Sequence, residues 1–270
     1  MQNRYTYTIL IVIVTVLLYY ANDYLDTKNE PYPNSEMATS NYKEFDASFL
    51  PKSTTGVIVE HNFYTLSYVE KHEQAEWVAY ELQKNQVVKS NFKRPYFVED
   101  RKVRTGSADW KNYKKSGYDK GHLCPAGDRK FDYNAFHETF LTSNISPQNH
   151  DFNRGIWNRL EQKTRYWAKK YDGVYVITGG VLEGDLKEIG PENVSVPKYF
   201  YKIIIDTSNE EYKAIAFLIP NQKSSNSFYD YSVSIDEIEI LTGIDFFPKL
   251  DDTIEKKLES ESNLKAWGKR

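Results

Sequence analysis

One histidine, two asparagines and a glutamate stand at spacings that suit hydrolysis of a phosphodiester. His122 follows a glycine and precedes a turn-forming run, Pro125–Asp128. Asn144 and Asn153 lie nine positions apart, and Glu161 follows Asn153 by eight. A neutral imidazole can take a proton from water near pH 7, and side-chain oxygens can bind a hard cation. These residue types therefore indicate a general base beside a one-metal site.

Each of these residues also has a plainer interpretation. A lone histidine is more often a surface residue or a hydrogen-bonded core residue than a base, and either role is the alternative interpretation of His122. The other histidines have no supporting context in the sequence: His61, His72, His137 and His150. The single cysteine, Cys124, excludes an intramolecular disulfide and is interpreted as a small buried thiol, not as a nucleophile or metal ligand.

The charge distribution indicates a local site for a polyanion. The net charge is −3, yet eleven Lys or Arg stand against five Asp or Glu between Lys93 and Lys130. A second basic stretch, Asn153–Lys170, holds six against one, whereas acids gather at Asp23–Asp46 and Asp236–Glu261. Attraction to phosphates acts through nearby charges and is screened over about 10 Å, so a basic middle can bind nucleic acid. The alternative is an ordinary solvated surface.

The elements that must position these residues are predicted from hydrophobic periodicity. Short runs rich in β-branched and aromatic residues alternate with turn signals and predict strands of an antiparallel sheet. The predicted strands are Val57–Val59, Tyr64–Val69, Glu76–Leu82, Phe97–Val98, Val174–Thr178, Tyr199–Ile205 and Tyr212–Ile219. Because strands and helices are intermixed along the chain, the predicted fold class is α+β.

Two helices are predicted from their apolar faces and caps. Asn153–Lys170 carries apolar residues on one broad face and basic residues on the others. Asn153 would open this helix, so Glu161, two turns later, would act through water or by orienting Asn153. A capping box at Ser234–Glu237 starts a second helix, which should end at Gly243.

The N-terminus suggests membrane attachment. Residues 1–22 contain an uncharged run, Thr8–Ala21, with aromatic ends and no small-residue cleavage site, which predicts an uncleaved signal-anchor. The charges flanking it favour a cytoplasmic N-terminus, so the folded domain would lie outside the cytoplasm, in a periplasmic or extracellular space. A cleaved signal peptide, which would release a secreted protein, and a buried strand are the alternatives. Residues 23–53 are expected to be a flexible tether, and 54–270 one folded domain.

Three blocks in the middle of the chain resemble the DNA/RNA non-specific endonucleases. That family has an Asp-Arg-Gly-His block, then Ser-Asn-x-x-Pro-Gln, then Asn-x-Gly-x-Trp followed by a Glu. The corresponding residues here are Asp119–His122, Ser143–Gln148, Asn153–Trp157 and Glu161. The resemblance runs from about Trp77–Tyr80 to Thr242–Phe247 and so covers nearly all of the expected domain.

The resemblance implies a ββα-metal finger of the His-Me type, in which a strand carries His122, a return strand ends near Asn144, and a helix begins near Asn153. It implies that His122 is the general base and that Asn153 is the one direct ligand of a hydrated Mg²⁺, for which Mn²⁺ could substitute. Asn144 would hold the site together or contact phosphate, and Glu161 would anchor the metal's waters.

The resemblance implies two further phosphate contacts, one of which departs from the family. Arg94 matches a family arginine that contacts the phosphate. Lys120 stands where the family usually has Arg, and lysine keeps the charge but not the planar, bidentate fork. Phosphate binding is therefore expected to be retained with weaker geometric control.

The predicted function is a metal-dependent hydrolase that cuts DNA and RNA with little sequence preference. The expected partners are DNA, RNA and, through residues 1–22, a membrane, with a homodimer as a possible assembly. The alternatives are a nucleic-acid-binding surface protein whose site is inactive, and a phosphodiesterase that acts on a non-nucleic substrate.

Overall fold

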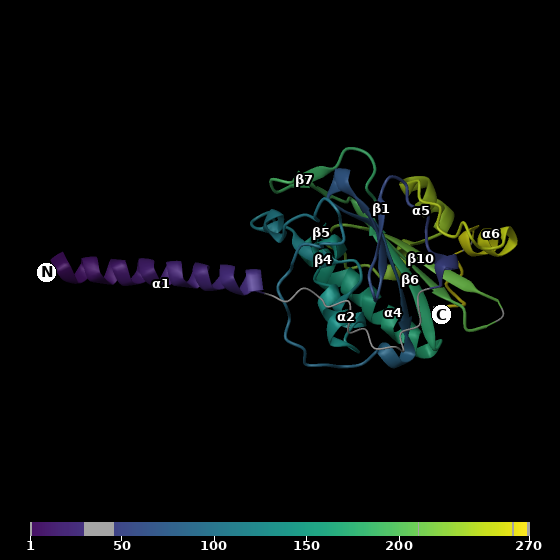
Figure 1. The fold of residues 1–270 in the computed structure, drawn as a ribbon. Coiled ribbons are helices and arrows are strands. Elements are labelled where there is room, and N and C mark those ends of the chain that lie inside the picture. The colour runs from purple at the N-terminus through teal and green to yellow at the C-terminus, as the bar shows by residue number, and fades with distance from the viewer. Residues whose placement is uncertain (1, 30–45, 210, 261, 269–270) are drawn as a thin grey trace.

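A twisted seven-stranded antiparallel sheet forms the centre of the molecule (Figure 1). The structure is a computed structural model and describes residues 2–29, 46–209, 211–260 and 262–268. The strand order is β1-β2-β3-β6-β9-β10-β11. The bounds are β1 Val57–Glu60, β2 Thr65–Val69, β3 Gln74–Gln83, β6 Gly173–Gly180, β9 Tyr199–Asp206, β10 Lys213–Pro220 and β11 Ser232–Val233. The predicted strands are therefore confirmed except Phe97–Val98, where Val98 makes only an isolated bridge to Leu141.

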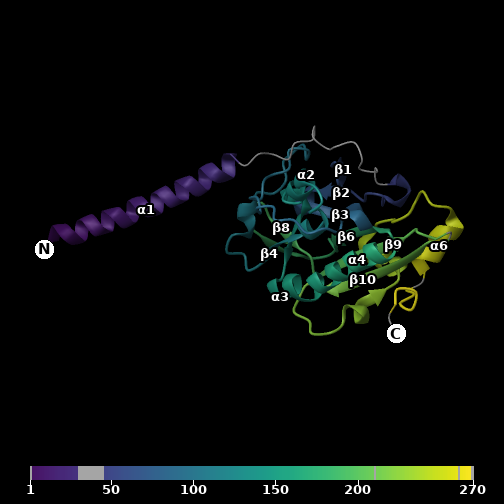
Figure 2. The same cartoon turned by 90° about the horizontal axis from the view of Figure 1, so that it is seen from below.

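Both faces of the sheet are buried, which explains the continuous apolar runs in its central strands. In β3, Val78 and Tyr80 point into the core on one face, and Trp77 and Ala79 point into the core on the other. Helix α4 (Asn158–Lys170) covers the first face through residues such as Leu160. Helices α5 (Ile235–Thr242) and α6 (Asp252–Ser260) cover the second, as Figures 1 and 2 show. The α+β class is confirmed as a mixed fold with an antiparallel sheet.

Smaller elements extend the first face. These are β4 Asp119–His122, β5 Ile145–Gln148, α2 Tyr133–Glu138, α3 His150–Phe152, β7 Lys187–Ile189 and β8 Val194–Val196. The predicted cap of α5 is confirmed, because Ser234 Oγ accepts a hydrogen bond from the Glu237 backbone N–H at 3.1 Å. Gly243 ends that helix in the left-handed conformation, with φ 69°.

The prediction of a membrane-spanning signal-anchor at residues 1–22 is wrong. The segment does form a helix, α1 (Gln2–Asn29), which extends away from the sheet (Figure 1). Its apolar run, however, reaches only from Ile9 to Leu18. Ten residues of helix span about 15 Å, half of a hydrocarbon core about 30 Å thick. Within the described part of the chain, no helix is long and apolar enough to cross a membrane. The location outside the cytoplasm depended on that span and is corrected with it.

Most of the expected tether, 23–53, lies in residues that the structure does not describe or whose side chains it does not place. Its described end already belongs to the core, because Phe49 is 2% exposed and stacks on Tyr175 with ring centroids 4.6 Å apart. The domain boundary expected at residue 54 stays a prediction, and the packed chain includes Phe49.

Candidate active site

The chemistry-bearing residues lie on a two-stranded hairpin followed by a helix. Strand β4 pairs antiparallel with β5, so that His122 lies opposite Ile145 and Asp119 lies opposite Gln148. Gly121 is required between them, because a Cβ at this position would lie 2.2 Å from the side-chain carbonyl carbon of Gln148. The ββα arrangement is therefore present in the structure. The return strand begins just after Asn144 and does not end there as expected.

The helix that carries Asn153 begins earlier than expected and is kinked at Gly155. Asn149 caps it by accepting hydrogen bonds from the backbone N–H groups of Asp151 and Phe152. The chain is kinked within Asn153–Trp157, where Gly155 leaves helical geometry at φ −97° and ψ −107°. Helix α4 continues from Asn158. The kink therefore separates Asn153 from the regular helix that carries Glu161.

Asp119 holds the side chain of Asn153 across the hairpin. Asn153 Nδ2 donates a hydrogen bond of 3.0 Å to Asp119 Oδ2. The other carboxylate oxygen of Asp119 lies 3.1 Å from His150 Nδ1. Burial raises the pKa of Asp119, but the hydrogen bonds from Asn153 and His150 outweigh it and hold that pKa below its usual value. Because the amide nitrogen faces Asp119, the amide oxygen of Asn153 is left for another ligand.

His122 lies in an aromatic pocket that keeps it uncharged. Its ring is edge-to-face with Phe140, with centroids 5.0 Å apart, and tilted against Phe97 at 5.6 Å. Burial, followed by the positive charge of Arg94, lowers the pKa of His122 to about 3. Its Nε2 is buried without a hydrogen-bond partner among the described residues. A histidine with this pKa is a free base at neutral pH.

Two cations, Arg94 and Lys120, lie over the aromatic rings around this histidine. The guanidinium carbon of exposed Arg94 lies 5.4 Å from the centroid of Phe97 and 5.3 Å from that of Phe140. Lys120 Nζ lies 5.3 Å from the centroid of Phe97. Burial and the neighbouring Arg94 both lower the pKa of Lys120. Arg94, Lys120 and His122 therefore share one aromatic platform, which places two positive charges beside the imidazole.

Asn144 points into the protein and is bound entirely to backbone. Its Oδ1 accepts from the Cys124 N–H at 2.8 Å, and its Nδ2 donates to the carbonyls of Cys124 at 3.0 Å and Thr139 at 2.9 Å. The side chain is fully buried. Of the two roles expected for Asn144, this geometry supports holding the site together. Cys124 is buried as expected, and burial raises the pKa of its thiol to about 12.

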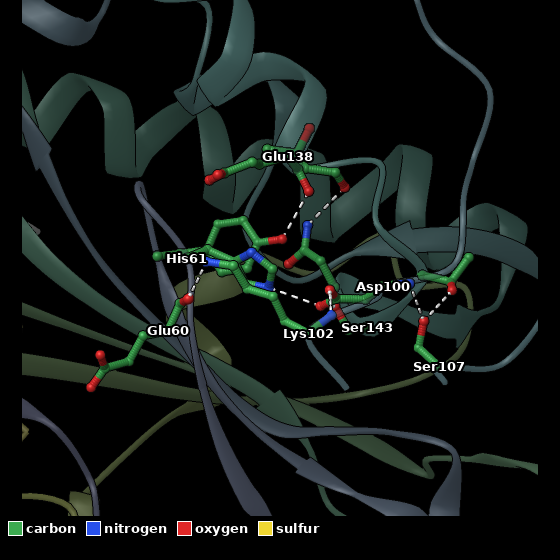
Figure 3. Close-up of polar contacts among 11 residues, drawn as sticks. Glu60, His61, Asp100, Lys102, Ser107, Glu138 and Ser143 are labelled. Carbon is green, nitrogen blue, oxygen red and sulfur yellow. Dashed lines mark hydrogen bonds and ion pairs between the residues drawn. The ribbon is translucent and has the colours of Figure 1, made fainter. Parts of the chain in front are cut away.

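A buried polar network behind Asn144 was not found from the sequence. Figure 3 shows Asp100 at its centre, where Oδ2 lies 2.8 Å from His61 Nε2 and accepts a 2.5 Å hydrogen bond from Ser143 Oγ. The Asp100 backbone N–H donates to Ser107 Oγ at 2.7 Å. Burial opposes ionisation, but the hydrogen bond and charge of His61 outweigh it and lower the pKa of Asp100 to about 2. The network joins the end of β1 to the residue before Asn144. No local pattern in the sequence signals it.

Glu161 is influenced by a cluster of charged residues: Lys202, Asp128 and Arg165. Burial raises its pKa to about 7, while Lys202 and Arg165 lower it and Asp128 raises it. Lys202 is fully buried and lies 4.8 Å from the centroid of Trp157. Arg165 is paired with Asp128 at 2.6 Å. The positive charges of Lys202 and of Arg165, one turn along α4, therefore favour the ionised form of Glu161.

The donor set of this site fits a magnesium ion. The groups that could hold it are the free amide oxygen of Asn153 and, through water, the carboxylate of Glu161. Hard oxygen donors with few direct protein ligands suit Mg²⁺, which keeps several of its waters. The orientation of Asn153 by Asp119 is the kind of outer contact that fixes a metal ligand.

The DNA/RNA non-specific endonuclease family model matches residues 41–253, which covers most of the chain and all of the residues just described. The chain belongs to this family. It is 35% identical over 211 residues to the mitochondrial nuclease EXOG of Danio rerio, covering 71% of this chain and 62% of that protein. It is 30% identical over 267 residues to the mitochondrial endonuclease G of Caenorhabditis elegans, covering 87% of this chain and 84% of that protein.

A solved structure agrees in fold. The crystal structure of the EndoG/EndoGI complex, which concerns the mechanism of EndoG inhibition, matches with a TM-score of 0.70 and 29% identity. The match covers 80% of this chain and 94% of that one. The chain spans between 56% and 62% of the length of the vertebrate EXOG relatives.

The names of the relatives do not agree with the predicted location of the folded domain. Several of the relatives are named as mitochondrial nucleases, among them those of Danio rerio, Homo sapiens and Saccharomyces cerevisiae. None of these names describes a periplasmic or extracellular protein anchored in a membrane. Together with the short apolar run of α1, they overturn the predicted location.

Proposed function

We propose that this chain is a metal-dependent endonuclease that hydrolyses phosphodiester bonds of DNA and RNA. The main support is that one hairpin and helix bring together an uncharged imidazole, His122, and an amide, Asn153, oriented by Asp119. Hydrolysis of a phosphodiester needs a base on one side of the phosphorus and positive charge around it. Family membership supports the same reaction.

His122 acts as the general base in this proposal. Burial and Arg94 lower its pKa, so the imidazole is uncharged at neutral pH, which is the form that a general base requires. Arg94 and Lys120 lie over the same aromatic platform and bind the non-bridging oxygens of the phosphate. Contacts to phosphate carry no sequence information, which accounts for little sequence preference.

Asn153 would hold Mg²⁺, or Mn²⁺ in its place, through the oxygen that Asp119 leaves free. When bound there, the ion supplies positive charge against the charge that develops on the phosphate and on the departing 3′ oxygen. Glu161 would hold the waters of the ion, and Asn144 would position the segment after His122.

A basic pocket along α4 supports a nucleic-acid substrate. The pocket has a volume of about 470 Å³ and is lined by Lys89, Lys130 and Lys169 around Tyr166. These three lysines form no ion pair with any described residue. The pocket's Arg165 stands one turn beyond Glu161 on α4, so a chain of phosphates could run from the site into the pocket. Unpaired cations around an aromatic ring suit phosphates and stacked bases.

The direct test is cleavage by the full chain. Supercoiled plasmid and a structured RNA are incubated with protein and Mg²⁺, with and without a chelator. We expect nicking and RNA cleavage that require the metal and fall by a factor of about 10²–10⁴ in His122→Ala. His72→Ala is the matched control, because His72 lies outside the site and bonds Ser195.

Two results would contradict the proposal. Binding of plasmid without cleavage in any divalent metal would indicate a nucleic-acid-binding protein. Cleavage only of small phosphodiesters would indicate a non-nucleic substrate. Size-exclusion chromatography during purification tests the homodimer, which stays a prediction.

A further inference from the structure

Three carboxylates converge on the face of the sheet opposite the candidate active site. Asp236 and Glu239 come from α5, and Glu259 comes from α6; these helices lie side by side in Figure 1. One oxygen of each carboxylate lies within 4.8 Å of the others. This cluster belongs to the acidic stretch Asp236–Glu261, which the proposed nuclease function does not use.

Glu259 is the unusual member of the cluster. It is only 8% exposed, and its Oε1 is buried without a hydrogen-bond partner among the described residues. A buried carboxylate without a partner is costly, because removal from water disfavours its charge. Burial, and then the carboxylates of Glu239, Glu255, Asp236 and Asp245, raise its pKa to about 8.

Among the described residues, the charged groups that act most strongly on Glu259 provide no compensating positive charge. Each of the neighbours that act on it is acidic, whether it lies on α5, on α6 or in the turn after α5. Lys257 of α6 is paired instead with Glu211 at 3.3 Å. Lys256 is exposed. The cluster thus combines repulsion with a buried, unpartnered oxygen, and a cation would relieve both.

Glu239 is already held in one orientation. Its Oε1 accepts the backbone N–H of Phe246 at 2.9 Å, which ties the side chain to the turn after α5. The described residues give its Oε2 no hydrogen bond, so this oxygen can serve as a ligand. A fixed carboxylate reduces the side-chain ordering that binding an ion would otherwise require.

We propose that Asp236, Glu239 and Glu259 bind one Ca²⁺ ion that joins α6 to α5. Oxygens up to 4.8 Å apart can face each other across Ca²⁺, whose ligands lie at about 2.3–2.6 Å. Mg²⁺ binds at about 2.0–2.1 Å in strict octahedral geometry and spans only about 4.2 Å. Calcium also accepts water and backbone carbonyls in irregular arrangements, which suits the last turn of α6.

The ion would stabilise the C-terminal part of the chain without taking part in catalysis. Beyond α6, Trp267 is buried in the core on the opposite face and donates from Nε1 to the Ala214 carbonyl at 3.1 Å. Its own carbonyl accepts from Trp167 of α4 at 3.2 Å. The chain therefore passes from the calcium site to the helix of the candidate active site, and anchoring α6 restrains this connection.

The test uses the full chain, freed of metal and then supplied with Ca²⁺, with heat unfolding and calorimetric titration as readouts. At a Ca²⁺ concentration about 100-fold above Kd, we expect the Tm of the wild type to rise by about 5 °C or more. Glu259→Gln should lose this rise and the calorimetric signal. Without metal and at a pH above about 8, where wild-type Glu259 is ionised, the same variant should melt at or above the wild-type Tm, because the buried repulsion is gone. That measurement separates loss of binding from failure to fold.

Two further variants separate this site from the catalytic one. Asn153→Ala should keep the full response to Ca²⁺, because the Asn153 amide is not part of the cluster. Glu237→Gln, an exposed acid on the same helix outside the cluster, should keep it as well. The proposal is overturned if about 10 mM Ca²⁺ leaves the wild-type Tm unchanged, since that concentration exceeds the Kd of even weak protein sites. It is also overturned if Glu259→Gln responds as the wild type does; Glu259 would then be a protonated acid sharing its proton with a neighbour.

Discussion

Asn153 Nδ2 donates a 3.0 Å hydrogen bond to Asp119 Oδ2, so a carboxylate on a strand fixes an amide on the following helix. Removing this contact should weaken metal binding while leaving the base in place. In Asp119→Ala we expect the Mg²⁺ concentration for half-maximal plasmid cleavage to rise by about 10–100-fold. The measurement is a Mg²⁺ titration of the initial cleavage rate.

Asp151→Asn is the matched control for Asp119→Ala. Asp151 is exposed at the start of the same helix and lies 3.9 Å from Lys223, so its loss should change the Mg²⁺ titration less than about twofold. Equal titration curves for wild type and Asp119→Ala would show that Asp119 does not orient the ligand.

Asn144 should behave as a structural residue and not as a phosphate contact. Its three hydrogen bonds all go to backbone groups, two of them to Cys124 just after His122. Asn144→Asp keeps the size but turns two donated bonds into contacts between oxygens. We expect a loss of stability of about 1–3 kcal/mol together with a large loss of activity. His122→Ala, in contrast, should lose activity with little change in Tm. Chemical denaturation and plasmid nicking measured on the same samples would separate the two cases.

The features of the fold that depend on neighbouring residues could be predicted from the sequence. Alternating and continuous apolar runs located the strands, and the polar cap at Ser234 and the glycine at 243 located α5, because these signals depend on neighbouring residues only. The motif blocks likewise brought His122 and Asn153 to one hairpin and helix. Helix α6 was not predicted, although Ile254 and Leu258 stand four residues apart along it.

Features that depend on distant segments were not predictable in the same way. Asp100 and His61 are 39 residues apart and meet only because β1 ends beside the loop that carries Asp100. The kink at Gly155 was not predicted, because the surrounding sequence also fits an ordinary helix. The membrane prediction was wrong because the uncharged run Thr8–Ala21 belongs to a helix whose described part is not long and apolar enough to cross a membrane.

Lys120 tests how much of the phosphate contact depends on charge alone. Its ammonium lies 5.3 Å from the centroid of Phe97 and 5.7 Å from that of Trp110, so it is held by ring faces beside the imidazole. Lys120→Gln should lower kcat/KM by about 10–100-fold, because a charge-assisted contact is lost. Lys120→Arg should stay within about threefold of the wild type or exceed it. A loss of kcat/KM in the arginine variant as large as that in the glutamine variant would mean that the phosphate contact depends on the shape of the lysine side chain and not on its charge.

The Glu161 carboxylate is expected to lower the stability of the folded protein while supporting nuclease activity. Its folded pKa is raised to about 7, chiefly by burial, so the folded state holds a proton between about pH 4.5 and 7 that the unfolded state has lost. Its contribution to stability therefore falls as pH rises through that window. Without metal, Glu161→Gln should raise the Tm by a few degrees at pH 8 and by almost nothing at pH 4. Nuclease activity should fall in the same variant. Thermal scans at several pH values test this, and a Tm gain that does not depend on pH would point to repacking instead of charge.

The basic pocket should contribute affinity for long substrates without contributing to chemistry. Lys89, Lys130 and Lys169 line it, and each phosphate contact adds about 0.7–0.9 to the slope of log affinity against log salt. Replacing all three by Gln should lower that slope by about 2–3, as measured by fluorescence anisotropy with a long oligonucleotide and a His122→Ala background. Cleavage of a small chromogenic phosphodiester should be unchanged, because that substrate does not reach the pocket. The matched control, Lys249→Gln with Lys256→Gln, removes exposed lysines near α6 and should leave the slope unchanged. If both sets of variants reduce the slope equally, the electrostatic attraction of the oligonucleotide comes from the whole surface of the protein. The substrate would then not follow a path from Glu161 along α4.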